Sequence, residues 1–535
     1  MNYDYVVVGA GSAGCVVAAR LSERPDIKVV LLESGGRDDD IELKMPLVFT
    51  KLRNHPKLDW GFATDPEPFA DNRVIRSARG KVLGGSSSTN GMMYSRGHPR
   101  DYDQWAQMGA RGWSYEEVLP YFKRSERNWR GEGPAHGGSG PLSVVPYTSD
   151  EPIAEAIRDT ALALNYRVLD DFEAGDPEGF GLPDSTICRG RRASASQAFL
   201  RPARNRPNLA VITGAHATRI LIEKGRAVGV EYRKGGATAV VYASREVVLS
   251  GGAYASPQLL MLSGIGPSAH LNEIGIPIVL DLPGVGKDLQ EHPLVPMGFA
   301  AKQPFKFSRK LRADRLAGSV IKWMLTGRGL PSTVPLSAIA YYKSRPELER
   351  PDLENIFMST SLAAEVWFPG WRKPKPDVLT SLNVVLRPGS RGFVKLRSAD
   401  PAEPPRIQFN FLQDPEDLRL LRYALRWTRD FVRQGALAKH VGAEVFPGGA
   451  VETDAALDAY IRQTVSTGEH PTSTCKMGQG EDAVVDPQLR VRGIEGLRIA
   501  DASIMPSVIS GHTNAPSIMI GEKAAELMLA DLDAG

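Results

Sequence analysis

Gly9-Ala10-Gly11-Ser12-Ala13-Gly14 decides the fold, because it stands between an apolar run, Tyr3 to Val8, and a helical pattern, Cys15 to Leu21. In such a turn the first glycine reverses the chain, the second lets backbone approach a pyrophosphate, and the third lets the helix pack closely on the strand. The free N–H groups of the helix start attract phosphate. The sequence therefore predicts a dinucleotide-binding strand–helix–strand unit at the N-terminus.

A second predicted strand, Lys28 to Leu32, ends at Glu33, 19 residues after Gly14. A carboxylate at this place accepts hydrogen bonds from a ribose 2′-hydroxyl and repels a 2′-phosphate. Taken alone, the motif leaves open an ordinary βαβ turn and does not choose between NAD and FAD.

The composition excludes several classes of protein. The 535 residues carry 65 basic and 62 acidic side chains, so we expect no nucleic-acid surface. Cys15, Cys188 and Cys475 form no CxxC pair, which indicates reduced thiols and neither a disulfide framework nor a metal site. No run approaches the ~20 apolar residues of a membrane span. Without a signal-peptide pattern, we expect a cytoplasmic protein, as a monomer or a homodimer.

Alternating segments between 205 and 255 predict further strands, with hairpin turns at Gly225 and Gly235-Gly236. These strands are Leu209 to Thr213, Ala217 to Ile222, Ala227 to Arg233, Ala239 to Ala243 and Glu246 to Ser250. A buried strand at Leu497 to Asp501 returns the chain to this unit. Gly284 to Asp288 lacks the rest of a phosphate loop and is interpreted as a surface turn.

The segment from about 300 to 460 has a different pattern, with proline-rich loops between its elements. We predict strands at Leu382 to Leu386 and Gly392 to Arg397 and a helix over Pro415 to Arg433. This pattern is typical of an α+β domain whose sheet roofs a cavity.

Four loops carry the residues suited to chemistry. Arg79 to Met93 is rich in small residues and hydrogen-bond donors, and Gly252 to Gly266 is a glycine turn with a helix begun at Ser256-Pro257. Glu469 to Gly478 and Asp501 to Pro516 each contain one histidine, His470 and His512. A histidine in such a loop is often structural, so the loops alone do not establish a site.

Together these loops resemble the glucose–methanol–choline (GMC) family of FAD-dependent oxidoreductases, over essentially the whole chain and nearest to its bacterial choline- and alcohol-dehydrogenase branch. Gly252 to Gly266 matches the second family signature, and Gly80 to Asp103 matches the first except at Thr89, where an aliphatic residue is usual. His470 lies in the motif HP-x-x-T-C-K/R-M-G.

The resemblance implies an α/β FAD-binding domain of Rossmann-like GMC type and a discontinuous α+β substrate-binding cap with an antiparallel sheet. We expect the FAD domain to comprise 1–155, 203–298 and 463–535, and the cap 156–202 and 299–462. Because tethering members use a histidine before Asn90, and this chain has Thr89, the FAD should be non-covalent.

The implied reaction is oxidation of an alcohol to the aldehyde, with hydride transfer to flavin N5 and His470 as general base. His512 would hold the substrate oxygen, in a His/His pair, where the dehydrogenase branch more often has asparagine. Asn514-Ala515-Pro516 would begin a helix whose positive end faces the flavin. The expected cofactor-binding residues are Gly9, Gly11, Ser12, Ala13, Gly14, Glu33, Ser34, Trp60, Arg79, Val82, Gly84, Gly85, Ser86, Asn90, Gly91, Met92, Met93, Ala217, Ser250, Gly251, Gly252, Asp501, Ala502, His512, Asn514 and Pro516.

The substrate and the electron acceptor stay open at this point. The apolar segments Asn355 to Thr360 and Val366 to Phe368 favour a primary apolar or aromatic alcohol over choline, although Glu365 or Glu469 would suit a quaternary ammonium group. The acceptor is O2, a quinone or a redox protein, and Gly468 is a candidate determinant of oxygen reactivity. The alternative is a protein like the GMC hydroxynitrile lyases, in which FAD takes no redox part.

Overall fold

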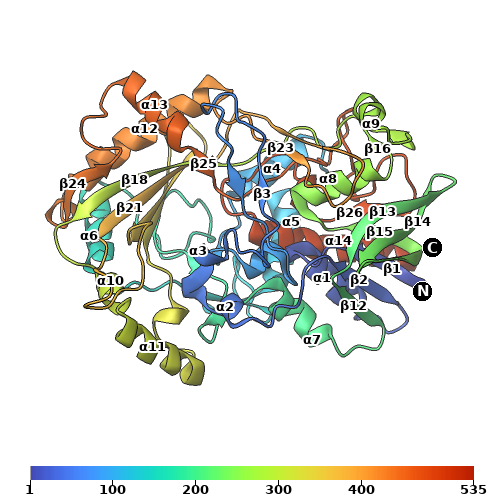
Figure 1. Cartoon of the computed structure of the whole chain (residues 1–535), viewed down its shortest axis with the longest axis horizontal. Helices are drawn as coiled ribbons and strands as arrows, with labels where there is room; N and C mark the ends of the chain where they lie inside the picture. The colour runs from blue at the N-terminus through green and yellow to red at the C-terminus, as the bar shows by residue number, and fades with distance from the viewer. Residues whose placement is uncertain (1, 535) are drawn as a thin grey trace.

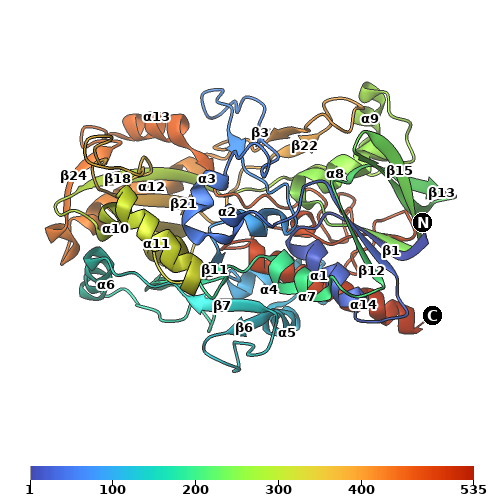
Figure 2. The same ribbon diagram turned by 60° about the horizontal axis from the view of Figure 1, so that its bottom comes forward.

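Two seven-stranded sheets lie at opposite ends of the protein in the computed structural model, which describes residues 2–534. Figure 1 shows helices between the sheets and both chain ends beside the first sheet, and Figure 2 shows the same separation from another side. A site between the sheets can therefore take residues from both.

The first sheet has the order β12-β2-β1-β15-β14-β13, with β26 beside β15. Its strands are β1 (Asn2–Val8), β2 (Val29–Glu33), β12 (Leu209–Thr213), β13 (His216–Glu223), β14 (Arg226–Lys234), β15 (Ala237–Leu249) and β26 (Leu497–Ile499). Helix α1 (Ser12–Leu21) connects β1 to its parallel neighbour β2, as the sequence predicts. A Cβ on Gly14 would lie 1.9 Å from the Gly9 carbonyl oxygen, so only glycine lets α1 pack this closely.

The hairpins lie where the glycines predict them. Gly225 (φ 79°), Gly235 (φ 57°) and Gly236 (φ 85°) occupy the left-handed region that tight hairpin turns require. One prediction here is wrong, because the two strands expected from 239 to 250 form the single strand β15. The polar pair Ser244-Arg245 forms a bulge opposite Asp4 and not a break, because pairing with β1 resumes at Glu246. The Ser244 hydroxyl donates to the Asp4 carboxylate at 3.0 Å.

The second sheet is antiparallel, as predicted, with the order β24-β18-β21-β20-β19-β8 and β25 beside β18. Its strands are β8 (Gly179–Gly181), β18 (Pro293–Ala301), β19 (Leu336–Tyr342), β20 (Leu353–Ser359), β21 (Val378–Val385), β24 (Val441–Phe446) and β25 (Ser466–Thr467). Helices α6 (Pro152–Ala163), α12 (Pro415–Val432) and α13 (Asp454–Thr464) pack against β19, β21 and β18. The predicted helix thus ends one residue earlier than expected.

Strand pairing also changes some expected limits. β21 begins at Val378, four residues before the predicted strand, and β22 (Phe393–Lys395) pairs only with β23 (Arg406–Gln408) in a separate ribbon. β18 runs as one strand across the expected domain limit at 298, and α6 crosses the limit at 155. Limits near 151 and 292 fit the pairing better, and the division into domains otherwise stays a prediction.

Helix α8 (Gly252–Leu262) begins earlier than predicted, with Pro257 inside it rather than at its start. Proline leaves the carbonyl four residues before it without its helical donor. That carbonyl, on Ala253, accepts the Thr474 hydroxyl at 2.7 Å instead. The Asp501 carboxylate accepts the Gly252 N–H and the Ser256 hydroxyl, at 2.9 and 2.6 Å, which extends the helix back to Gly252.

The last helix, α14 (Asn514–Ala534), packs along α1. The Ser12 hydroxyl donates to the Asn514 side chain at 2.8 Å, so the two helices begin side by side. Farther along, the Arg20 guanidinium binds Glu522. Among the described residues, no helix is long and apolar enough to cross a bilayer.

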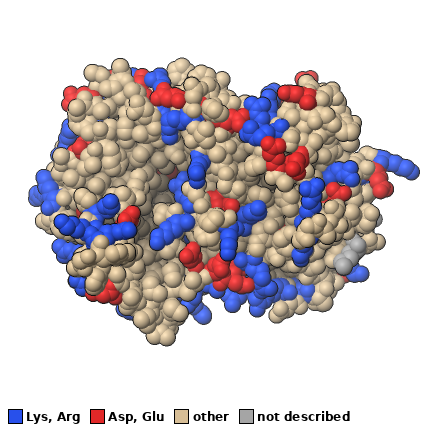
Figure 3. Space-filling view, in the orientation of Figure 1, with Lys and Arg blue, Asp and Glu red and all other residues tan. Residues whose placement is uncertain are grey.

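The other elements connect the sheets or lie at the surface. Their helices are α2 (Ile41–Lys44), α3 (Phe49–Leu52), α4 (Pro99–Gln107), α5 (Tyr115–Ser125), α7 (Arg201–Ala203), α9 (Ser268–Ile274), α10 (Lys306–Lys310) and α11 (Ala313–Thr326). Their strands are β3 (Phe62–Ala63), β4 (Arg76–Ser77), β5 (Met93–Tyr94), β6 (Glu126–Asn128), β7 (Leu142–Pro146), β9 (Asp184–Ser185), β10 (Ile187–Cys188), β11 (Arg191–Arg192), β16 (Ile265–Gly266) and β17 (Leu280–Asp281). On the face drawn in Figure 3, basic and acidic side chains are interspersed over much of the surface.

Candidate active site

A cavity of about 410 Å³ lies between the two sheets, within the ~300–1,000 Å³ usual for small-molecule and cofactor sites. Most of the expected site residues line it. They are Gly9, Gly11, Ser12, Ala13, Glu33, Ser34, Trp60, Arg79, Gly85, Ser86, Asn90, Gly91, Met92, Met93, Ala217, Ser250, Gly251, Gly252, His470, Asp501, Ala502, His512 and Asn514.

Four expected residues do not line the cavity: Gly14, Val82, Gly84 and Pro516. Gly14 lies at the α1–β1 contact, and Val82 and Pro516 are buried behind the wall. Gly84 has a φ of 89°, and a Cβ there would meet the Ser88 hydroxyl. These residues therefore shape the loops and helices around the cavity.

Glu33 marks one end of the cavity. Its carboxylate accepts the backbone N–H groups of Ala10 at 2.9 Å and Gly35 at 2.7 Å, which fixes it beside the glycine turn. Burial raises the pKa of Glu33 to about 7. No side chain caps the start of α1, so its first N–H groups stay available for a phosphate.

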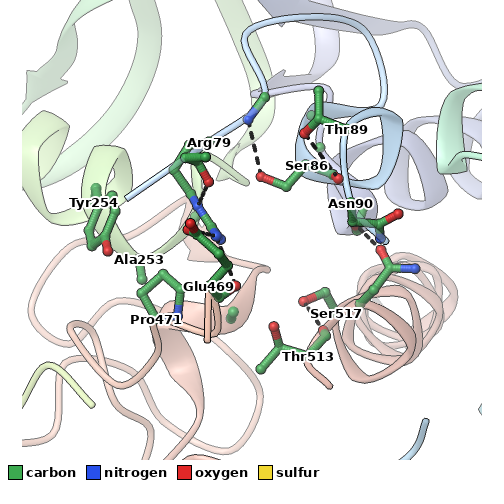
Figure 4. A pocket seen from close by; sticks show the side chains of 18 of the residues that line it. Arg79, Ser86, Thr89, Asn90, Ala253, Tyr254, Glu469, Pro471, Thr513 and Ser517 are labelled. Atoms are coloured by element: carbon green, nitrogen blue, oxygen red, sulfur yellow. Dashed lines mark hydrogen bonds and ion pairs between the residues drawn. The ribbon is translucent and has the colours of Figure 1, made fainter. Parts of the chain in front are cut away.

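The loop from Arg79 to Asn90 closes over the glycine turn. A Cβ on Gly85 would lie 2.8 Å from the Gly11 Cα, so the two loops meet backbone to backbone. The Arg79 guanidinium donates to the Glu469 carbonyl and carboxylate, both at 2.8 Å, and links this loop to the His470 loop (Figure 4). The arrangement leaves a cleft bordered by backbone donors.

The donor set fits a dinucleotide with a flat ring system. One end of the cavity offers the Glu33 carboxylate and the uncapped start of α1. A Cβ on Gly252 would meet nothing within 4 Å, so the backbone of Gly252 is open to the cavity. The start of α14, at Asn514, lies at the same cavity. Residues of this kind suit the ribose, pyrophosphate and ring of FAD.

Three histidines meet at the other end of the cavity. The rings of His470 and His512 have centroids 4.7 Å apart and stand edge to face. On the other side of His470, its Nδ1 lies 3.0 Å from Nδ1 of His292. No hydrogen bond within residues 2–534 engages Nε2 of His470, which is therefore available to a ligand.

Two carboxyl groups hold this cluster in place. Glu354 on β20, almost wholly buried, lies 3.0 Å from Nε2 of His512. The Oε1 atom of Glu291 accepts the backbone N–H groups of both His292 and His470, each at 2.8 Å. Glu291 thus fixes the two histidine loops relative to each other.

The electrostatics favour neutral imidazoles. Burial lowers the pKa of His470 well below its ordinary value of 6.5, and the imidazoles of His512 and His292 act in the same direction. Burial also lowers the pKa of His292 to about 4. Neutral His470 can accept a proton at neutral pH, as a general base must.

The wall beside the histidines comes from the second sheet and is apolar. Ile356 and Leu382 are direct cross-strand partners, as are Leu336 and Met358, and all four line the cavity with Leu294. The predicted roof is thus correct for Asn355 to Thr360 as a segment. Within it, Asn355 faces the other way and donates to Thr428 on α12 at 2.6 Å.

Three further expectations need correction. Val366 to Phe368 lie away from the cavity, and Glu365 pairs with Arg372 on the surface, so neither reaches a substrate. Gly284 to Gly286 are buried, with Gly284 against Asp482, so of the expected surface turn only Lys287 is exposed.

Gly468 lines the cavity, but its φ is not in the positive region, so a turn requirement does not explain it. A Cβ there would lie 3.1 Å from the His292 Cβ and 3.3 Å from Nδ1 of His470. A larger residue would therefore press on the histidine pair, and its role in oxygen reactivity stays a prediction.

Sequence reasoning missed His292, Glu291 and Glu354. A signal for the first two was present, because Glu291-His292-Pro293 repeats the tripeptide Glu469-His470-Pro471. Glu354 had none, since a single acidic residue in a strand gives no hint of a partner 158 residues away.

Comparison with known proteins agrees with this geometry. The models for GMC oxidoreductase match residues 3–294 and 388–521. An oxygen-dependent choline dehydrogenase of Sinorhizobium medicae is 42% identical over 534 residues, which cover 99% of this chain and 96% of that one. The structure of pyridoxine 4-oxidase from Mesorbium loti has a TM-score of 0.87 at 31% identity, covering 98% of this chain and 99% of that one. A formate oxidase variant of Aspergillus oryzae has a TM-score of 0.92 at 28% identity, covering 100% and 99%.

The chain therefore belongs to the GMC oxidoreductase family. As a member, it is an FAD-dependent oxidoreductase that acts on CH–OH groups of donors.

Denaturation should release all of the FAD, because Thr89 offers no imidazole for a bond to the flavin. We expect acid precipitation to leave a colourless pellet and a yellow supernatant whose absorbance matches the FAD content of the holoenzyme. Colour that stays with the pellet would contradict the non-covalent assignment.

Proposed function

We propose that the protein oxidises a primary alcohol with an apolar or aromatic body to the aldehyde. In this proposal His470 is the general base and His512 holds the alcohol oxygen. Bound FAD supplies the acceptor for the hydride that leaves the carbinol carbon. The single observation that supports the proposal most is the His470–His512 pair beside an apolar wall at the far end of the cavity from Glu33.

The hydrogen bond to His292 suggests which nitrogen of His470 accepts the proton. Burial lowers the pKa of His292 to about 4, so the ring is neutral, and we place its single hydrogen on Nε2. His292 Nδ1 then accepts from His470 Nδ1–H. Neutral His470 consequently has its lone pair at Nε2, which takes the hydroxyl proton of the substrate.

Glu354 orients the second histidine. In this proposal the Glu354 carboxylate accepts, so Nε2 of His512 carries the hydrogen of the 3.0 Å contact. This leaves Nδ1 of His512 for the alcohol, as an acceptor in the neutral ring and a donor in the charged ring. The alcohol oxygen would then sit between two fixed imidazoles.

The wall supports an apolar substrate over choline, for which the relative from Sinorhizobium medicae is named. The carboxylates at this end already have partners. Glu469 binds Arg53 and Arg79, Asp501 binds Gly252 and Ser256, and Glu354 binds His512. A quaternary ammonium group would therefore meet methyl groups rather than a free negative charge.

A panel of alcohols tests this function under anaerobic conditions. Aliphatic and aryl primary alcohols should bleach the flavin absorbance faster than choline does. Faster bleaching by choline would overturn the substrate class, and no bleaching by any alcohol would favour the lyase alternative. Turnover with O2 and with a dye acceptor then separates oxidase from dehydrogenase.

The rate of flavin bleaching should be constant between pH 6.5 and 8 and fall in more acidic solution. Since the pKa of His470 lies below 6.5, only acidic solution protonates it and removes the lone pair. Stopped-flow bleaching across this range is the measurement. A rate that rises with pH around 7 to 8 would contradict a neutral His470 and would point to another base.

A further inference from the structure

An apolar patch lies on the outside of the substrate-binding end, on α11 and the loop 361–372. Figure 1 shows α11 at the lower edge of the molecule, and in Figure 2 the helix lies at the front with no other element before it. The α11 patch consists of Ile321, Met324, Leu325, Leu362, Phe368 and Trp371. Leu325 is 80% exposed and Ile321 60% on α11, and Trp371 is 65% exposed on the loop bonded to the start of this helix.

The patch does not result from a loosely attached helix. Trp323, on the inner side of α11, is fully buried and donates its indole N–H to the Gly190 carbonyl at 2.7 Å. Ile321, Met324 and Leu325 are three and four positions apart, so they share the outer side. A surface helix ordinarily places polar residues there.

The loop is attached to the same surface. The Ala313 N–H donates to the Trp367 carbonyl at 2.9 Å, and the Trp367 indole donates to the Ser308 carbonyl at 2.9 Å. The neighbouring Phe368 and Trp371 are exposed on this loop, beside the start of α11.

Positive charge surrounds the patch. Residues 302–328 contain eight lysines and arginines and one acidic residue, Asp314, which pairs with Arg312 at 2.6 Å. Lys322, Arg328 and Lys373 have no side-chain hydrogen bond or ion pair to other residues of the described chain. In Figure 3 the lobe at the lower left, where Figure 1 places α11, is mostly tan, and basic side chains gather above it.

We infer that the α11 patch docks the protein on an anionic lipid bilayer. The apolar side chains would enter the boundary of the acyl chains, and the surrounding cations would contact the lipid headgroups. The charge distribution disfavours a second copy as the occupant, because it would bring two cationic rims together.

Docking would also bring the substrate cavity close to the lipid. From α11 the chain passes through the short helix Leu330–Ser332 to Val334 and Leu336, which line the cavity. An apolar alcohol dissolved in the bilayer would thus enter near its binding site. This consequence rests on the proposed function, whereas the docking itself does not.

Co-sedimentation of the intact flavoprotein with vesicles tests the inference. We expect binding to phosphatidylcholine vesicles that contain phosphatidylglycerol, weaker binding to phosphatidylcholine alone, and release at high salt. Leu325→Asp should abolish binding. Lys322→Ala with Arg328→Ala should weaken it about 30-fold, at ~1 kcal/mol per cation. The matched control is Val74→Asp, since Val74 is 57% exposed on the loop between β3 and β4.

Equal binding by the wild type and by both patch variants would overturn the inference, as would no binding to anionic vesicles. Light scattering measures the oligomeric state and so tests the other possible occupant of the patch, a second copy of the protein. If the wild type is a dimer that does not bind vesicles, and Leu325→Asp is a monomer, the patch binds a second copy instead of a bilayer. Because the double variant removes only exposed unpaired charges, its result stands even if Leu325→Asp loses FAD.

Discussion

Replacing His470 by alanine should slow anaerobic flavin bleaching by at least about 100-fold while the FAD stays bound, since general-base catalysis typically contributes ~10²–10⁴-fold. The expected loss follows from the position of the imidazole, whose free Nε2 faces the cavity between His292 and His512. The side chain makes no hydrogen bond to the cofactor loop from Arg79 to Asn90, so its removal should not release FAD. Stopped-flow spectroscopy with a good alcohol substrate measures the rate directly.

His512→Asn is the comparison variant. Asparagine retains a donor and an acceptor but cannot take up a proton, so we expect a loss of about tenfold or less, ~1.4 kcal/mol in barrier. If the two variants lose rate equally, the roles of base and oxygen holder are not divided as proposed. A His470→Ala enzyme that retains FAD and bleaches at the wild-type rate would remove His470 from the mechanism.

Glu291→Ala should have the next largest effect, a loss of between about tenfold and 100-fold in the bleaching rate. The carboxyl group accepts the backbone N–H groups of His292 and His470 from one oxygen. Without it both donors are buried and unpaired, at a cost of ~1–3 kcal/mol each, and the histidines shift. Displacement of a catalytic group by ~1 Å can cost 100-fold.

Glu291→Gln is the matched control, because its amide oxygen still accepts. Burial raises the pKa of Glu291 to about 8, so the carboxyl is mostly neutral at pH 7 and glutamine should keep nearly the full rate. The folded state holds this proton between pH 4.5 and 8, so the contribution of Glu291 to stability is lost as the pH rises through that range. The thermal midpoint of the wild type should therefore fall relative to Glu291→Gln over this interval. If the thermal midpoints of the wild type and Glu291→Gln change in parallel with pH, or if Glu291→Gln is as slow as Glu291→Ala, the negative charge of an ionised Glu291 is what the site needs.

The parts of the fold that depend on local sequence were predictable. The turn from Gly9 to Gly14 defines β1, α1 and β2, because glycine spacing and strand composition act over a few residues. The strand break expected near Ser244 was wrong, because β1 pairs with β15 on both sides of a bulge at Ser244-Arg245. Such partners come from distant sequence and leave no local pattern.

The candidate site likewise contains residues that the sequence predicted and residues that it did not. His470 and His512 lie in loops whose composition and family resemblance pointed to chemistry, and the structure brings them together. His292 was overlooked although it repeats the Glu-His-Pro tripeptide of the His470 loop, and the structure places it fully buried beside His470. Glu354 required knowledge of which face of β20 meets His512, which only the assembled sheet supplies.

The contact between the first and last helices has a consequence for how the protein is made. The Ser12 hydroxyl binds Asn514, 502 positions later, at the place where the cavity receives its final wall. Strand β26, which completes the first sheet, also comes from the end of the chain. A chain still on the ribosome therefore has its nucleotide turn early but no closed pocket until β26 and the start of α14 have emerged. Capture of the flavin consequently requires the chain at least as far as α14, and a truncation before Asn514 should yield a colourless protein.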